Sequence, residues 1–123
     1  MAIVDAWGDA AVALSTSQTG NGDSTNTAFR KVRASSGGAV IVTSVIGATP
    51  TVTVNIQGSV DGTNFFNIPY ALVATPETLS VAAITITTAV TTTYLLRPTH
   101  AWRYLKLAYS ANTNVTLTAT AYL

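Results

Sequence analysis

The strict alternation of apolar and polar residues in the second half of the chain constrains its fold more than any other feature. In residues 51–57, the residues Val52, Val54 and Ile56 occupy every second position and polar residues fill the others. Residues 114–121 repeat the pattern with small and branched apolar side chains. Because successive side chains of a strand point to opposite faces, each segment predicts a strand with one buried face and one exposed face.

Further strand-like segments cover much of the remaining chain, and none of them shows convincing helical periodicity. They are separated by short clusters of Gly, Pro, Asn and Asp, the residues that turns require. Asp61-Gly62 is the strongest hairpin signal, because glycine adopts the positive φ that tight turns need. The predicted strands are residues 10–15, 29–34, 39–46, 65–68, 79–87, 93–97 and 101–110, and the predicted turns are residues 36–38, 47–50, 61–64, 76–77, 97–98 and 111–114.

This organisation predicts one all-β domain, a single antiparallel β-sandwich of jelly-roll or immunoglobulin-like type. Of these two we expect the jelly-roll-like form. Residues 10–123 would form the sandwich, and residues 1–9 would form an extended N-terminal arm. The arm carries Trp7, which we expect to pack on its own domain or on a neighbour, since an exposed tryptophan is costly. Residues 16–27 are a polar, glycine-containing stretch, which predicts a mobile or functional loop.

Charged residues are scarce, and this limits the partners of the chain. Only 9% of the residues are charged, against about 25% in typical soluble domains, and the net charge is +1. So small a charge gives no strong attraction to nucleic acid or to an anionic membrane. Threonine supplies much of the polar surface, and neutral faces defend poorly against association. The surface is either that of a threonine-rich sandwich or one covered by other subunits, and we favour the second.

The sequence also bears on compartment and assembly. No apolar run approaches the roughly 18 residues that a membrane span needs. No basic residue precedes an apolar stretch at the N-terminus, so we expect no signal peptide and synthesis in a cytoplasm. Cysteine is absent. A small β-domain without disulfides often gains stability by oligomerising.

Residues that carry chemistry are few and scattered. The chain has one histidine, His100, and five acids, and their spacing indicates neither a metal site nor a pair of catalytic carboxylates. No Gly-x-Ser-x-Gly motif supports a catalytic triad. Residues 61–64 offer oxygen ligands for calcium but lack the repeated acids of a calcium loop, so we interpret them as a turn. We therefore expect no catalytic, metal-binding or cofactor-binding residues, no enzyme activity and no small-molecule ligand.

Aromatic and basic residues supply the candidates for protein contacts. Residues 30–33 hold the one basic cluster, and on a strand their charges would divide between two faces. Phe65 and Phe66 are adjacent and would point to opposite faces, so one of them is a candidate contact residue. Trp102 and Tyr104 would share a face opposite two leucines, which suits either sugar stacking or a subunit interface. The candidate interface residues are Ile3, Val4, Trp7, Arg30, Arg33, Phe66, Tyr70 and Trp102.

Two motifs resemble a small β-sandwich found in tailed-phage virions. Residues 52–66, with the sequence VTVNIQGSVDGTNFF, resemble an apolar strand that leads into a GSxDGxNF hairpin. Residues 102–107, WRYLKL, resemble a later RYLKL-type strand that precedes a threonine-rich last strand. The resemblance extends over roughly residues 38–123. Discoidin-type sugar-binding domains carry similar segments, but they are usually longer.

The resemblance implies a capsid decoration, or cement, protein of a bacteriophage. Such a protein would bind the major capsid protein on the outside of the assembled head, often as a homotrimer, and would stabilise the head. The arm would contact the capsid or a neighbouring subunit. Two alternatives stay open at this point: a carbohydrate-binding or adhesin-type module, and another virion component such as a head-fibre base or a tail protein.

Overall fold

The computed structural model describes residues 2–5, 11–30, 37–97 and 102–123. Within these ranges the regular structure consists of strands, and no helix is present, which confirms the all-β prediction. The strands are β1 (Ala2–Asp5), β2 (Ala11–Gln18), β3 (Gly22–Asp23), β4 (Asn26–Phe29), β5 (Gly38–Ser59), β6 (Phe65–Asn67), β7 (Tyr70–Leu72), β8 (Thr75–Ser80), β9 (Ile84–Ile86), β10 (Thr91–Leu96) and β11 (Tyr104–Tyr122).

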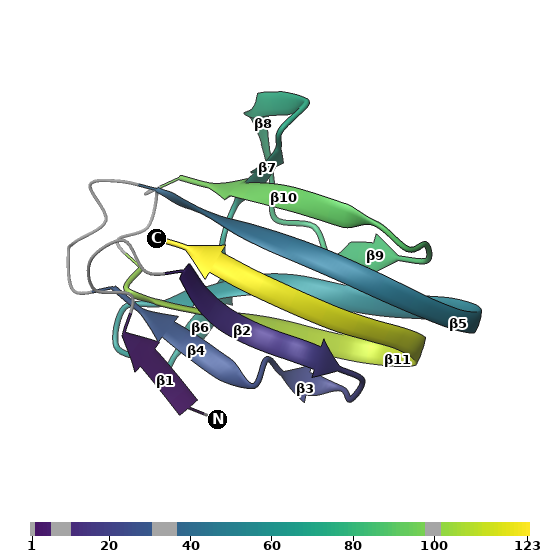
Figure 1. The fold of residues 1–123 in the computed structure, drawn as a ribbon. Helices are drawn as coiled ribbons and strands as arrows, with labels where there is room; N and C mark the ends of the chain where they lie inside the picture. Colours follow the sequence, from purple (N-terminus) through teal and green to yellow (C-terminus); the bar gives the residue numbers. More distant parts are fainter. Residues whose placement is uncertain (1, 6–10, 31–36, 98–101) are drawn as a thin grey trace.

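Two long strands, β5 and β11, form the centre of the fold. They run antiparallel to each other along almost their whole length, from the pair Ser59–Tyr104 to the pair Ala39–Tyr122. Both strands bend back at the same level, at the right of Figure 1. The bend interrupts the register between Ser110 and Val115. The predicted turns at 47–50 and 111–114 are therefore wrong: these residues are bends within continuous strands.

Left-handed backbone conformations make the sharp bend possible. Thr49, Ala111 and Asn114 have φ values of 44°, 52° and 54°. Such values are strained for residues other than glycine, asparagine and aspartate. The side chain of Asn114 donates a hydrogen bond from Nδ2 to the carbonyl oxygen of Ala48 at 2.6 Å, which ties the two bent strands together.

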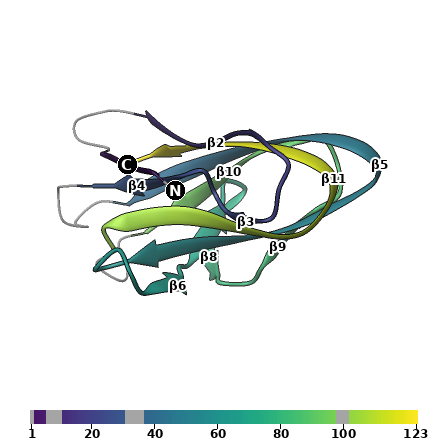
Figure 2. The same cartoon turned by 90° about the horizontal axis from the view of Figure 1, so that it is seen from below.

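The bend converts one sheet into two packed layers, which Figure 2 shows from the side. The first layer contains β2, the second half of β11, the first half of β5, β10 and β7, with β8 at its edge. The second layer contains β1, β4, β3, the first half of β11, the second half of β5, β6 and β9. The structure is thus an antiparallel β-sandwich, as predicted, while the jelly-roll connectivity stays a prediction.

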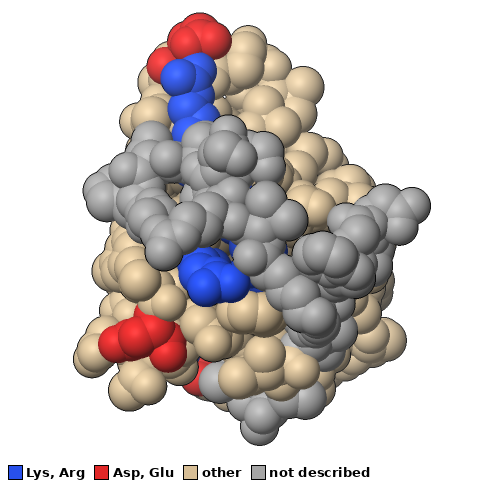
Figure 3. Space-filling model, turned by 90° about the vertical axis from the view of Figure 1, so that its left-hand side faces the viewer, with Lys and Arg blue, Asp and Glu red and all other residues tan. Residues whose placement is uncertain are grey.

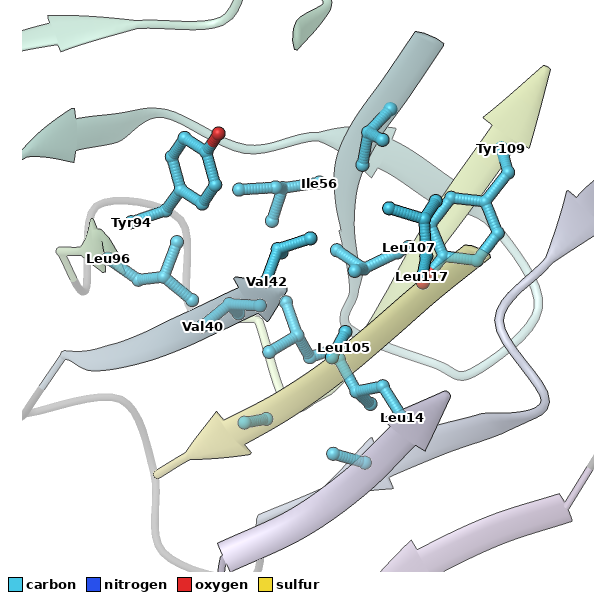
Figure 4. Close-up of a cluster of buried hydrophobic side chains, with 14 of the residues drawn as sticks. Leu14, Val40, Val42, Ile56, Tyr94, Leu96, Leu105, Leu107, Tyr109 and Leu117 are labelled. Carbon is cyan, nitrogen blue, oxygen red and sulfur yellow. The ribbon is translucent and has the colours of Figure 1, made fainter. Parts of the chain in front are cut away.

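The core lies between the layers and follows the alternation in the sequence. Figure 4 shows side chains from both halves of β5 and β11 meeting there. Leu105, Leu107 and Leu117 are fully buried, and the Tyr109 hydroxyl reaches the Ser15 Oγ at 2.8 Å. Burial raises the pKa of Tyr109 to about 12. The other core residues on β5 and β11 are Val40, Val42, Val52, Val54, Ile56, Val115, Ala119 and Ala121.

The N-terminal region differs from the sequence-based expectation. Residues 2–5 do not extend away as an arm, because β1 pairs in parallel with β4 at the edge of the second layer. The stretch 16–27 is not one loop, since β2 continues to Gln18 and β3 pairs with β11. The Gln18 amide oxygen accepts hydrogen bonds from Ser15 Oγ and from the backbone and hydroxyl of Thr25, which fixes this segment. Most of the predicted strand 29–34 lies outside the described residues, and Phe29 is the last residue of β4.

Candidate functional site

The turn that carries the phage-like motif is built around the carboxylate of Asp61. Its Oδ1 atom accepts hydrogen bonds from the backbone of Thr63 at 2.9 Å, from the backbone of Asn64 at 2.8 Å and from Ser59 Oγ at 2.9 Å. Its Oδ2 atom accepts one from Asn64 Nδ2 at 2.8 Å. Next to it, Gly62 has a φ of 81° and lies against the ring of Tyr104, where a side chain would collide. Asp61 therefore acts as the acceptor that closes a tight turn.

These hydrogen bonds hold the pKa of Asp61 well below its ordinary value of 3.8, with the backbone groups of Asn64 and Thr63 contributing most. A depressed folded-state pKa means that the unfolded chain binds the proton more readily. The carboxylate thus stabilises the fold above about pH 3.8, and this contribution is lost as the pH falls further.

Replacing Asp61 with asparagine is expected to destabilise the protein at pH 7, because the new amide nitrogen would face the donors that Oδ1 or Oδ2 now accepts from. The free energy of unfolding, measured by urea denaturation, should differ from wild type at pH 7 and differ less at pH 2. Val60→Thr, an uncharged change at the neighbouring exposed position, should show no such pH dependence. An equal effect of Asp61→Asn at both pH values would contradict this role.

Two candidate contact residues are buried and pack on each other. Trp102 has no exposed surface and Arg30 is 6% exposed. The Arg30 guanidinium lies 3.4 Å from the centre of the Trp102 ring, and its Nε and Nη2 atoms donate to the Trp102 carbonyl oxygen at 3.1 and 3.0 Å. Burial lowers the pKa of Arg30 to about 10, so it keeps its charge at neutral pH. Both side chains are thus used within the fold, and their burial does not support the prediction that they are interface residues.

The remaining aromatic candidates are half-buried. Phe66 packs against the core, and Phe65 lies under the Lys106 ammonium group at 4.3 Å from its ring centre. Tyr70 makes an edge-to-face contact with Tyr94 at 5.4 Å and donates its hydroxyl hydrogen to the carbonyl oxygen of Ala82 at 2.9 Å. Phe66 and Tyr70 are thus mainly structural.

The remaining candidate residues lie either on the N-terminal strand β1 or outside the described residues. Ile3 is 59% exposed on the edge strand β1, so it is free to make a contact. Val4 lies on the same strand, and its backbone pairs with Ala28. Trp7, Arg33 and His100 lie outside the described residues.

The outer surface of the first layer is a sheet face without a charged residue. It consists of the outward-pointing residues of β2, β5, β10 and β11, which Figure 1 shows side by side. All of them are exposed or half-buried. We call this surface the neutral face; its residues are Ala11, Ala13, Ala39, Ile41, Thr43, Val45, Thr91, Thr93, Leu95, Thr116, Thr118, Thr120 and Tyr122.

The outer surface of the second layer has a different character. Lys106 on β11 forms an ion pair with Asp23 on β3 at 2.9 Å. Gln57 on β5 donates a hydrogen bond to Asn67 on β6 at 3.1 Å. Charges and amides hold water strongly, whereas threonine methyl groups and aliphatic side chains do not. The two outer faces of the sandwich are therefore chemically distinct.

A second candidate surface is the hairpin of β7 and β8, which stands out from the sandwich at the top of Figure 1. Four aliphatic side chains in and next to this hairpin are exposed: Leu72, Val73, Leu79 and Val81. A hollow separates residues 72–74 from the start of β10. We call these four residues the hairpin cluster. This cluster was not among the residues predicted from the sequence, although the aliphatic residues on both sides of Pro76 indicated it.

The hairpin edge is poorly suited to pairing with another strand. β8 pairs with β7 only at Tyr70–Ser80 and Leu72–Thr75, so the residues between bulge outward. Pro76 lacks a backbone donor, and Glu77 forms an ion pair with Arg97 beside it. Bulges, proline and charge are the features that block edge-to-edge pairing. The hairpin can therefore contact a partner through its side chains and not by adding a strand.

Chemical groups able to bind a metal do not converge in the described residues. No group of three His, Cys, Asp or Glu residues is found among them. On the face drawn in Figure 3, the described charged side chains stand in a few small groups among uncharged residues. In the same described part of the chain, no helix has the length and hydropathy of a membrane span.

The chain matches no protein-family model, no curated protein and no solved structure with which we compared it. The two motifs that resemble the phage sandwich have structural roles in this chain. Ser59 to Asn64 form the turn closed by Asp61, and Leu105 and Leu107 lie in the core. Gly58 lies so close to Trp102 that a Cβ atom there would be 3.0 Å from the Trp102 Cβ. The resemblance therefore concerns the scaffold and not a binding site.

Proposed function

We propose that the protein is a structural component of a bacteriophage virion, a decoration protein that binds the outer surface of the assembled head and stabilises it. The observation that carries the proposal is the hairpin cluster, four exposed aliphatic side chains on a projecting hairpin. Exposed apolar side chains gathered on one projection are typical of protein interaction sites. The motif resemblance supports the choice of a phage head as the partner.

We also propose that the protein acts without catalysis. The single histidine, the absence of cysteine and the five dispersed acids of the sequence support this proposal. Within the described residues, Asp61 is committed to its turn, and Asp23 and Glu77 are engaged in ion pairs. A protein that strengthens a shell needs stable contacts and no reactive group.

The carbohydrate-binding alternative loses the feature that favoured it. A sugar-stacking site needs an exposed flat aromatic face, and Trp102, the best candidate on the sequence, is fully buried. Tyr104, its expected neighbour on such a face, packs against Phe29 at 4.9 Å and covers Gly62. Trp102 and Tyr104 thus do not form the aromatic face that the sequence suggested for sugar stacking.

Replacing Val73 with lysine is expected to weaken attachment to the head at least tenfold, because the interface would have to bury an unpaired charge. Val60→Lys is the matched control, since Val60 is 56% exposed and Val73 is 60% exposed, and Val60 lies in the turn at Asp61. Attachment is measured by co-sedimentation of each purified variant with heads of the phage that encodes the protein.

Three outcomes distinguish attachment through the hairpin from attachment through another surface and from sugar binding. Binding lost with Val73→Lys and kept with Val60→Lys supports attachment through the hairpin. Equal binding of both variants shows that another surface attaches. No binding of the wild-type protein to heads, together with specific hits on a glycan array, would overturn the proposal in favour of a sugar-binding module.

A further inference from the structure

The neutral face has an ordered pattern of large and small side chains. The strand register aligns its residues in rows that cross β10, β5, β11 and β2 in that order. One row reads Leu95, Ala39, Tyr122, Ala11, so that each large side chain stands next to a small one. The pattern is a property of the register and could not be read from the sequence.

The next two rows contain only threonine and aliphatic side chains. The second row reads Thr93, Ile41, Thr120, Ala13. The third row contains Thr91, Thr43 and Thr118, and the Thr91 and Thr43 hydroxyls are hydrogen-bonded at 3.1 Å. A hydroxyl that bonds its neighbour on the same face exposes mainly its methyl group. At Thr43 and Thr91 the face is therefore less polar than its threonine content suggests.

A twofold rotation makes this face complementary to itself. Consider an axis that runs parallel to the strands, in the plane of contact, between β5 and β11. The rotation reverses the order of the strands, so Tyr122 of one copy meets Ala39 of the other, and Leu95 meets Ala11. In the second row, Ile41 meets Thr120. Every large side chain thus faces a small one across the contact.

We propose that a second copy of this chain docks on the neutral face, giving a twofold dimer in which the first layers of two sandwiches pack face to face. Charge favours this occupant, because two faces without charges meet with no repulsion and no charge to desolvate. Packed sheets lie about 10 Å apart with strand directions within about 30° of each other, and the parallel strands that this axis produces fall within that range, so interlocking side chains can fill the gap. The inference concerns self-association and stands apart from attachment to a head.

The size of the face sets the expected affinity. Four strands at about 4.8 Å spacing and about seven residues of about 3.3 Å each make a face of roughly 20 by 23 Å. Two such faces bury roughly 900 Å², slightly below the range of stable specific interfaces, which begins at about 1,200 Å². We therefore expect reversible association, with a dissociation constant on the order of 10 μM or weaker.

The test compares two equivalent threonine residues on the same strand. Thr43 and Thr53 both lie on β5 and are both half-buried, but Thr43 belongs to the neutral face and Thr53 to the outer surface of the second layer. Sedimentation equilibrium from about 1 μM to about 1 mM should show wild type and Thr53→Lys moving from monomer to dimer. Thr43→Lys should dimerise at least tenfold more weakly, because two lysines would approach each other across the axis.

A second measurement fixes the orientation of the axis. The chain has no cysteine, so Ala48→Cys carries one spin label at the exposed bend of β5, at one end of the neutral face and outside it. With the axis parallel to the strands and between β5 and β11, this label lies near the axis, and the distance between the labels of the two copies should be short. An axis across the strands would place the two labels far apart.

Several results would overturn the proposal: a wild-type monomer at 1 mM, a trimer of the kind that the phage resemblance implies, equal dimerisation of Thr43→Lys and Thr53→Lys, or a long distance between the two labels. Circular dichroism and urea denaturation confirm that the variants are folded.

Head binding by Thr43→Lys tests whether the dimer and the attachment to heads use different surfaces. A variant that binds heads but stays monomeric supports both the dimer and an independent attachment surface, whereas a dimer that binds no heads contradicts the proposed function alone.

Discussion

Replacing Trp102 with alanine is expected to lower the free energy of unfolding by about 4 kcal/mol, the largest single effect in the core. The side chain is fully buried, fills the space above Gly58, and carries the Arg30 guanidinium on its ring. Removing it leaves a cavity and takes away the aromatic surface on which a buried cation rests. Because whole domains are stable by about 5–15 kcal/mol, this loss removes a large share of the total stability and should lower the urea midpoint clearly.

Urea denaturation followed by far-ultraviolet circular dichroism measures this loss. Leu72→Ala is the control, since Leu72 is exposed on the hairpin and should change stability by only about 0.5 kcal/mol. Combining Trp102→Ala with Arg30→Met gives a double-mutant cycle, and we expect a coupling energy of about 1 kcal/mol for the cation and the ring. Additive effects would mean that the two side chains stabilise the fold separately.

Replacing Gly37 with alanine is expected to destabilise the protein by about 3 kcal/mol or more, although only one methyl group is added. A Cβ atom at this position would stand 1.9 Å from the carbonyl oxygen of Leu96. That oxygen belongs to the backbone of β10, which pairs with β5 next to this point, so it cannot rotate away as a side chain could. Folding of the variant would require the strands to separate locally.

Gly20→Ala is the matched control, because no atom lies within 4 Å of the position where its Cβ would be. This variant should be as stable as wild type or slightly more stable, since alanine restricts the unfolded chain. Thermal unfolding followed by circular dichroism compares the two. A Gly37→Ala protein that melts at the wild-type temperature would show that β10 and the start of β5 do not approach so closely in solution.

The features that were predicted correctly from the sequence are those that depend on residues close together in the chain. Alternation placed Val52, Val54, Ile56 and the buried residues of β11 on the correct faces, because burial of one face is what the alternation reflects. The hairpin at Asp61 was also predicted, since its turn depends on residues close together in the chain. The absence of predicted helices agrees with the described residues for the same reason.

The features that the sequence could not predict depend on distant partners. Gly47 and Pro50 normally end a strand, yet β5 continues through them because β11 bends at the same level. Arg30 looked like a surface cation, and only the fold brings it to Trp102, 72 positions away. The two candidate surfaces, the neutral face and the hairpin cluster, require knowledge of the register and of the bulge in β8. Composition indicated an uncharged surface but not its location.

The pairing of β5 with β11 also determines when this protein can fold. Ala39 finds its partner at Tyr122, and each layer of the sandwich takes one half of both strands. Contacts between such distant segments form slowly, since a long stretch of chain must be closed before any stabilising pair is made. During synthesis, the second layer cannot be completed until about residue 110 has left the ribosome, and the first layer cannot be completed until residue 122 has left it. Newly made chains thus expose their apolar strands throughout translation, and slow release or high expression should favour aggregation over the native sandwich.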